Sequence, residues 1–174
     1  IPLIVGTWQK GIRDFDPEKA YRAMKEIQTT PSRPHECGGY VGNRNLVPYM
    51  SMGYVPADEG PVSNTLEYAY DDWCVGQLAK ALGKTDDYNY FMARSQNWRN
   101  VFDNSTGYMR PKYEGGPWYE EFTPVKSAVG KEDNFGTRDY VEANAWQYTW
   151  FVPHDLKGLI SLMGKDEFNN RLET

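Results

Sequence analysis

The chain has 174 residues, which suits one domain with a hydrophobic core. Its net charge is −5 and its 19 basic residues are scattered, so we expect no nucleic-acid partner, because phosphate binding depends on clustered cations. No apolar run reaches the roughly 18 residues that a membrane helix needs, and we therefore expect no membrane span.

Aromatic residues make up 15% of the chain, with 6 Trp, 13 Tyr and 7 Phe. Such rings serve either a hydrophobic core or a cleft that stacks sugars, and ordinary burial habits favour the core. The two cysteines, Cys37 and Cys74, are too few for a metal cluster and are expected to be free or buried thiols.

The first half of the chain predicts one helix followed by a long loop. The apolar start, Ile1 to Val5, has no evident partner strand. Asp16 can cap a helix that begins with Pro17 and runs to about Gln28. Pro and Gly then recur throughout residues 31–61, which predicts a long ordered loop without a helix.

The middle of the chain predicts a helical hairpin. Apolar residues at spacings of three and four favour a helix from Ser63 or Asn64, as N-cap, to Leu82. A second helix, capped by Thr85, is expected to reach Phe102. The short connection leaves the second helix no room except antiparallel to the first.

A second long aromatic loop is expected over residues 107–139, and a last long helix over residues 144–163. Pro153 must kink or divide that helix, and Asp166 is expected to cap one more. The predicted fold class is all-α, with helical hairpins separated by long aromatic loops.

The chemistry available to the chain lies in carboxylates among aromatic residues. His35 and His154 form no metal-binding pair, and the glycine-rich nucleotide motifs are absent from the sequence. Glu142 lies at the start of the last predicted helix, between Tyr140 and Trp146. It is either a general acid or a capping carboxylate, and an acid role needs burial or a second carboxylate beside it.

Three other carboxylates lie on the first helix of the predicted hairpin. Glu67 and Asp71 share one helical face, as a metal or acid pair, as a solvated face, or as an electrostatic complement to Arg94 or Arg99 on the neighbouring helix. We interpret Asp72 as structural.

The aromatic segment after Glu142 also leaves alternatives. Trp146 and Trp150 suit a core better than a sugar platform. His154 either orients the turn after Pro153 or binds a ligand.

Several segments resemble the signature sequences of glycoside hydrolase family 92, the exo-acting α-mannosidases. They are KGIRDFD at residues 10–16, GYVPAD at residues 53–58, TLEYAYDDW at residues 65–73, EANAWQYTWFVPHD at residues 142–155, and GLI at residues 158–160. The resemblance covers nearly the whole chain. One departure is Ala143, where the family usually has Gly.

The resemblance implies part of an (α/α)₆ toroid behind a β-sandwich, and calcium-dependent, inverting hydrolysis of terminal α-mannosides, with α-1,2 linkages expected. By the same resemblance Glu142 is the general acid, and Asn144, Trp146 and His154 bind the substrate, a mannose-containing glycan. The water-activating aspartate and the calcium ligands belong to segments that the family has farther along.

The resemblance also implies that residues 1–174 are a partial catalytic domain, incomplete at both ends and inactive alone. Self-association of such a piece is expected, because helices lacking neighbours expose apolar surface. The family habit of export implies a secreted or periplasmic protein. The alternatives are another activity on the same architecture, and a non-catalytic helical domain that binds glycans or a partner.

Overall fold

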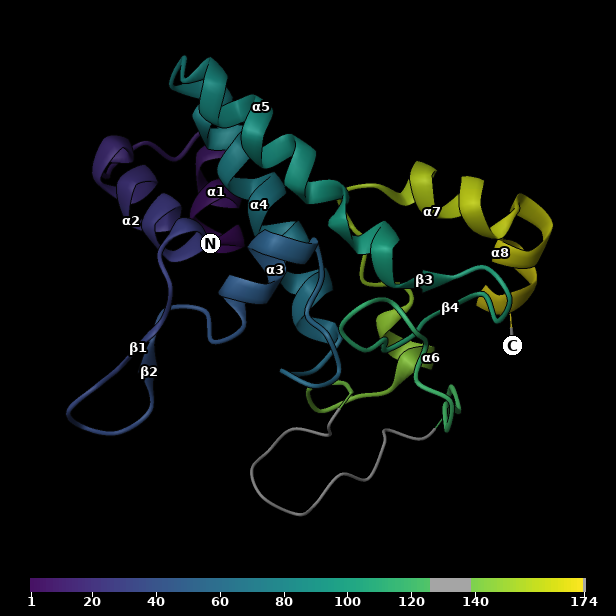
Figure 1. The fold of residues 1–174 in the computed structure, drawn as a ribbon. Coiled ribbons are helices and arrows are strands. Elements are labelled where there is room, and N and C mark those ends of the chain that lie inside the picture. The colour runs from purple at the N-terminus through teal and green to yellow at the C-terminus, as the bar shows by residue number, and fades with distance from the viewer. Residues whose placement is uncertain (126–138, 174) are drawn as a thin grey trace.

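The computed structural model describes residues 1–125 and 139–173 (Figure 1). Its helices are α1 (Pro2–Gln9), α2 (Pro17–Thr29), α3 (Leu46–Met52), α4 (Ser63–Ala81), α5 (Thr85–Arg94), the 3₁₀ helix η1 (Ser95–Val101), α6 (Ala145–Tyr148), α7 (Leu156–Met163) and α8 (Lys165–Leu172). Two antiparallel pairs of two-residue strands, β1 (Arg33–Pro34) with β2 (Tyr40–Val41) and β3 (Phe102–Asp103) with β4 (Tyr108–Met109), complete the elements. The predicted all-α class is confirmed.

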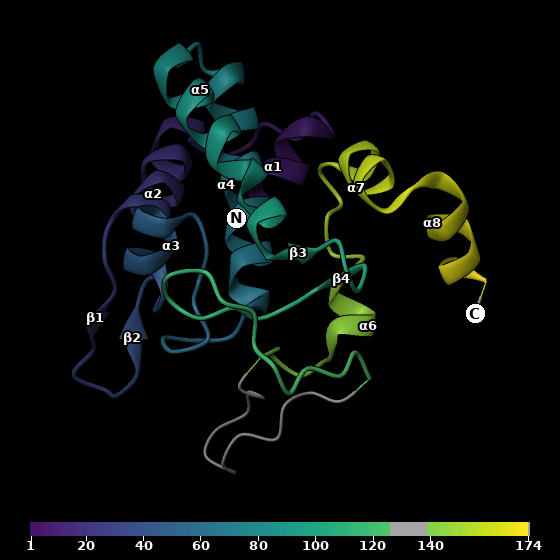
Figure 2. The same ribbon diagram turned by 45° about the vertical axis from the view of Figure 1, so that its right-hand side comes forward.

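Helix α4 is the central element of the fold. It contacts α1, α2, α5 and η1. Its buried residues lie all around its circumference rather than along one stripe, as expected of a helix surrounded by protein. Figures 1 and 2 show α2, α3 and the β1–β2 pair on one side of α4, and α7 and α8 on the other.

The predicted hairpin of α4 and α5 is confirmed (Figure 1). Gly83 lies in the turn with φ of +73°, a conformation that favours glycine. Gly76 lets the two helices approach closely, because a Cβ atom there would lie 3.3 Å from Met92 Sδ. The second helix continues from Arg94 as 3₁₀ turns, so that the helical segment ends at Val101.

No element is predicted for the apolar start of the chain, whereas the prediction of a loop without a helix over residues 31–61 is wrong. The apolar start is helical, and it buries Val5 in the same core cluster as residues of α4. The region 31–61 contains α3, although Pro48 lies within it. Pro48 is the third residue of that helix, where the backbone N–H has no partner within the helix and its absence costs little.

The predicted last helix is divided rather than kinked. Residues 149–155, which include Pro153, separate α6 from α7. Asp166 lies in the first turn of α8, but Gly164 occupies the cap position. Val62, not Ser63 or Asn64, caps α4, and Lys84, not Thr85, precedes α5.

A buried ionic cluster joins four helices of the N-terminal half. Asp72 of α4, fully buried, accepts hydrogen bonds from Tyr49 Oη of α3 at 2.7 Å and from Arg94 Nε of α5 at 3.0 Å. Arg94 Nη1 also donates to the carbonyl of Gln28 in α2 at 2.9 Å. The interpretation of Asp72 as structural is consistent with this cluster.

Among the described residues, no helix is long and apolar enough to cross a membrane. Cys74 is buried and Cys37 is exposed, and both are free thiols, as expected.

Replacing Asp72 by Ala is expected to lower the free energy of unfolding by about 3–5 kcal/mol, because it leaves the Arg94 guanidinium buried without its counter-ion. Burial raises the pKa of Asp72 to about 7, so the measurement, urea unfolding of the chain, belongs at pH 8, where the carboxylate is ionised. The exposed Asp86 of α5 supplies the control, since Asp86→Ala should change stability by no more than about 0.5 kcal/mol. Equal losses in the two variants would contradict the role of the cluster.

Candidate active site

Glu142 lies in a short turn directly before α6. Glu142 is exposed. Its φ is +54°, and no other non-glycine residue that the structure describes has a positive φ. L-residues adopt this left-handed conformation at a cost, and they keep it only where surrounding contacts impose it. The neighbouring Ala143 has no positive φ, so the methyl group that it carries in place of the family's Gly is compatible with its backbone conformation.

Contacts on both sides hold this turn. Val141 N donates to Ser63 Oγ at 3.1 Å, and Ser63 N donates to the Asp139 carbonyl at 3.4 Å. Tyr140 is fully buried, and its hydroxyl donates to the Met109 carbonyl. The first residue of α4 and the strand β4 therefore fix the backbone that leads to Glu142.

Tyr148, at the end of α6, connects the turn to α4. Its hydroxyl donates to Glu67 Oε1 at 2.8 Å and lies 3.3 Å from the Val141 carbonyl oxygen. Its ring stacks on Tyr140, with centroids 5.8 Å apart. Burial, followed by the hydrogen bond to Glu67 and the charges of Glu67 and Glu142, raises the pKa of Tyr148 to about 12, so Tyr148 stays protonated and acts as a donor.

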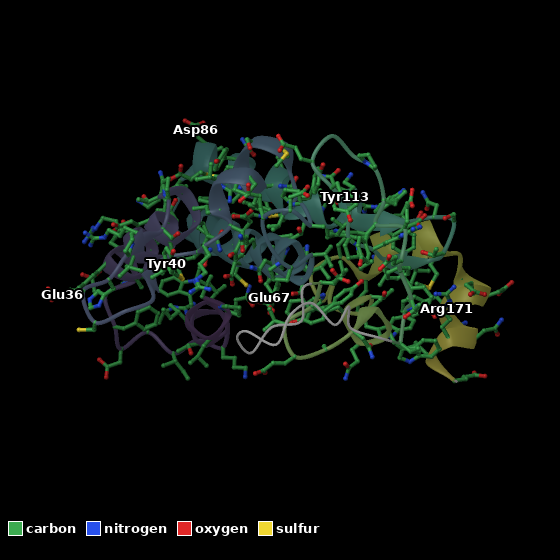
Figure 3. The ribbon with its side chains drawn as sticks, turned by 60° about the horizontal axis from the view of Figure 1, so that its bottom comes forward. Glu36, Tyr40, Glu67, Asp86, Tyr113 and Arg171 are labelled. Carbon is green, nitrogen blue, oxygen red and sulfur yellow. The ribbon has the colours of Figure 1, made fainter. Side chains whose placement is uncertain are left out.

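The carboxylates of α4 do not form the solvated face that the spacing favoured. Glu67 is half-buried among the side chains near the middle of the molecule, whereas Glu36 and Asp86 lie at its outer edges (Figure 3). Asp71 accepts a hydrogen bond from Gln28 Nε2 at 3.1 Å, and burial together with the charge of Glu67 raises the pKa of Asp71 to about 6.

Nor do these carboxylates complement the expected arginines. Arg94 pairs with Asp72, and Arg99 pairs with Asp155 at 2.7 Å. Within residues 1–125 and 139–173, no group of three or more His, Cys, Asp or Glu residues could hold a metal ion.

Asn144 and Trp146 lie beside Glu142, at the start of α6. Asn144 Oδ1 caps the helix by accepting from Gln147 N at 3.2 Å, and its Nδ2 donates to the Val125 carbonyl at 3.1 Å. Each end of the amide keeps further hydrogen-bonding capacity. Trp146 is 38% exposed and contacts Tyr108 with ring centroids 5.9 Å apart, so the core position expected for it is wrong.

Trp150 and His154 are half-buried, and both pack against other aromatic side chains. Trp150 meets Phe168 edge to face at 5.3 Å, as expected of a core residue. His154 Nε2 lies 2.9 Å from the Ser95 carbonyl oxygen, and its ring stacks on Tyr70 at 5.8 Å. Burial lowers the pKa of His154, and its Nδ1 atom is buried without a hydrogen-bond partner. These contacts orient the turn after Pro153.

A separate pocket lies in the segment between β4 and the Glu142 turn. It has a volume of about 320 Å³ and is lined by Tyr113, Pro117, Trp118, Tyr119, Glu120 and Glu121. Aromatic walls with neighbouring carboxylates offer apolar faces and hydrogen-bond acceptors together, which is the chemistry that a sugar ring requires.

If contacts around the turn impose the conformation of Glu142, glycine should suit position 142 better than alanine. We expect Glu142→Gly to be more stable than Glu142→Ala by about 1 kcal/mol, because only glycine adopts a φ of +54° without steric cost. Urea unfolding of the two variants measures the difference, and the comparison cancels the loss of the carboxylate. Greater stability of the alanine variant would show that the backbone at position 142 is not left-handed.

Comparisons with known proteins place this chain in a family. The sequence matches the glycosyl hydrolase family 92 catalytic domain over residues 1–174. It is 40% identical to a family 92 α-mannosidase of Bacteroides thetaiotaomicron in complex with mannoimidazole, with a TM-score of 0.82 over 99% of this chain and 21% of that chain. An inverting family 92 mannosidase of the same species is 34% identical, with a TM-score of 0.85 over 99% of this chain and 22% of that chain.

A curated relative is named as a glycosidase. An uncharacterized secreted glycosidase of Arthroderma benhamiae is 29% identical over 98% of this chain and 25% of its own length. The chain thus spans about a fifth to a quarter of the proteins it matches. It belongs to glycosyl hydrolase family 92, whose catalytic domain it matches.

Proposed function

We propose that the chain contributes the proton donor of an inverting α-mannosidase that removes terminal, α-1,2-linked mannose from glycans. The observation that carries this proposal is the turn at residues 139–144, which presents an exposed carboxylate, Glu142, from a backbone held by Ser63 and Tyr140. The proposal is supported by the similarity to two α-mannosidases, one of them inverting.

In this proposal Glu142 protonates the glycosidic oxygen as the bond to the leaving sugar breaks. An exposed position lets the carboxyl group reach a bound substrate, and the fixed backbone limits the entropy lost in orienting it. Inversion also needs a second carboxylate, about 6.5–9.5 Å from the first, to activate water on the opposite face of the sugar. We assign that base to a segment of the enzyme outside this chain.

We propose three further residues for substrate binding. Trp146 offers an exposed indole face on which a mannose ring, or the ring of mannoimidazole, can stack. Asn144 has one amide hydrogen and one oxygen lone pair left for sugar hydroxyls. His154 is assigned to the same site, and its protein contacts favour an indirect part in it.

The described residues do not by themselves fit a calcium site, since no sufficient group of ligands is present among them. We therefore derive no catalytic step through calcium. A calcium requirement of the complete enzyme remains part of the proposal, with ligands outside this chain.

We also propose export and self-association. The Arthroderma benhamiae relative is named as a secreted glycosidase, which supports a secreted or periplasmic location. Large apolar side chains such as Leu3, 82% exposed, and Ile12, 55% exposed, support self-association of the isolated chain. Sedimentation of the isolated chain as a strict monomer would contradict the latter.

A second candidate function is a glycan-binding module without catalysis. The pocket around Trp118 favours it, because its aromatic walls and carboxylates have the chemistry of a sugar site.

The substitution Glu142→Gln in the complete gene product should lower kcat/KM for an α-1,2-mannobiose substrate by about 10²–10⁴-fold, the usual contribution of general acid catalysis. Glutamine keeps the size of the side chain and removes the transferable proton. The rate of mannose release measures the effect, and Glu36→Gln, at the exposed turn between β1 and β2, is the matched control.

Retention of full activity by Glu142→Gln would contradict the assignment of the acid. The isolated 174-residue chain is expected to release no mannose, and turnover by that chain would contradict the assignment of the base to another segment.

Titration of the isolated chain with a mannose-terminated oligosaccharide, followed by tryptophan fluorescence, separates the two candidate functions. A partial active site should respond weakly, with Kd of about 1 mM or higher, because much of its contact surface is missing. A micromolar Kd that is lost in Trp118→Ala but kept in Glu142→Gln would instead favour the binding module.

A further inference from the structure

We propose that Glu67 is a positioning residue for Glu142, acting through the hydroxyl group of Tyr148. The inference rests on the proposed function, because it assigns Glu142 as the acid whose orientation matters. It extends that function to a carboxylate on another element, 75 residues earlier in the chain.

Two hydrogen bonds connect the turn and α6 to α4. Val141 N–H donates to Ser63 Oγ at 3.1 Å. The Tyr148 hydroxyl donates to Glu67 Oε1 at 2.8 Å. The same Tyr148 oxygen lies 3.3 Å from the Val141 carbonyl oxygen, so the side chain that Glu67 binds lies against the residue before Glu142.

Glu67 fixes the orientation of the Tyr148 hydroxyl. A carboxylate oxygen accepts hydrogen bonds, whereas a hydroxyl group without such a partner can turn to donate elsewhere. With its proton committed to Glu67, Tyr148 keeps its ring stacked on Tyr140, with centroids 5.8 Å apart, and its oxygen beside the Val141 carbonyl.

The geometry of α4 brings both supports of the turn together. Ser63 and Glu67 are four residues apart, so their side chains lie on the same face of the helix, one turn apart. Ser63 binds the Val141 N–H, and Glu67 binds Tyr148, whose oxygen lies 3.3 Å from the Val141 carbonyl oxygen. The residue before Glu142 is thus held at its N–H by Ser63 and lies at its carbonyl against Tyr148.

This arrangement explains how the left-handed Glu142 is maintained on the surface. A strained backbone persists only where its surroundings over-determine it, and the described contacts of the turn are made by its neighbours, not by the exposed Glu142 side chain. Among residues 1–125 and 139–173, no Lys or Arg forms an ion pair with Glu67, so its acceptor capacity stays available to Tyr148.

The test is a double-mutant cycle in the complete gene product, with two substrates. Glu67→Ala, Tyr148→Phe and the double variant are assayed on an α-1,2-mannobiose, whose leaving group needs protonation, and on an activated aryl α-mannoside, whose leaving group does not. Glu67→Gln keeps an acceptor oxygen for Tyr148, and Glu36→Ala is the exposed control (Figure 3).

We expect Glu67→Ala and Tyr148→Phe each to lower kcat/KM on mannobiose by about 10–100-fold, the scale that a misplaced catalytic group costs. The effect on the aryl mannoside should be at most about threefold, because general acid help matters little there. The double variant should be no worse than the poorer single variant, and Glu67→Gln should stay within about threefold of the wild type, as expected when only the shared hydrogen bond is at stake.

Three outcomes would overturn the inference: equal losses on both substrates, additive losses in the double variant, or a loss in Glu67→Gln as large as that in Glu67→Ala. Should Glu67→Ala fail to fold in a thermal melt, Tyr148→Phe and Glu67→Gln still test the inference, because equal losses of Tyr148→Phe on both substrates, or a loss in Glu67→Gln as large as that in Tyr148→Phe, would overturn it. Failure of the proposed function is distinguishable, because the wild type would then release no mannose or Glu142→Gln would remain active.

Discussion

The burial of α4 on all sides is the constraint on which the rest of the structure depends. Since α1, α2, α5 and η1 all contact this helix, few of its side chains can change without disturbing a neighbour. The polar residues it buries must therefore find partners. Asp72 binds Tyr49 and Arg94, and Ser63 binds Val141, so these two buried residues of α4 fix segments distant in sequence.

The same constraint connects the core to the candidate active site. The N-terminal end of α4 holds the turn before Glu142, while its middle is anchored by the ionic cluster around Asp72. A packed helix thus supports the turn, and Glu142, the proposed acid, stays exposed at the surface. Sites supported by packed secondary structure hold catalytic groups more accurately than loops alone.

The sequence predicts the parts of this arrangement that depend on local patterns. The α4–α5 hairpin follows from apolar spacing and a short glycine turn, and the division at Pro153 follows from the missing N–H. The contact between Glu67 and Tyr148 joins residues 81 positions apart, and no local pattern encodes it. The sequence predicts Ser63 as a candidate N-cap of α4. Its hydroxyl oxygen instead accepts a hydrogen bond from Val141 N, so a tertiary contact replaces the local one.

The structure of the complete gene product with bound mannoimidazole tests the central claim most directly. If Glu142 is the proton donor, one of its carboxyl oxygens should lie within about 2.6–3.2 Å of the imidazole nitrogen that takes the place of the glycosidic oxygen, with the turn still held by Ser63. A complex in which another carboxyl group occupies that position, and Glu142 remains in solvent, would contradict the account.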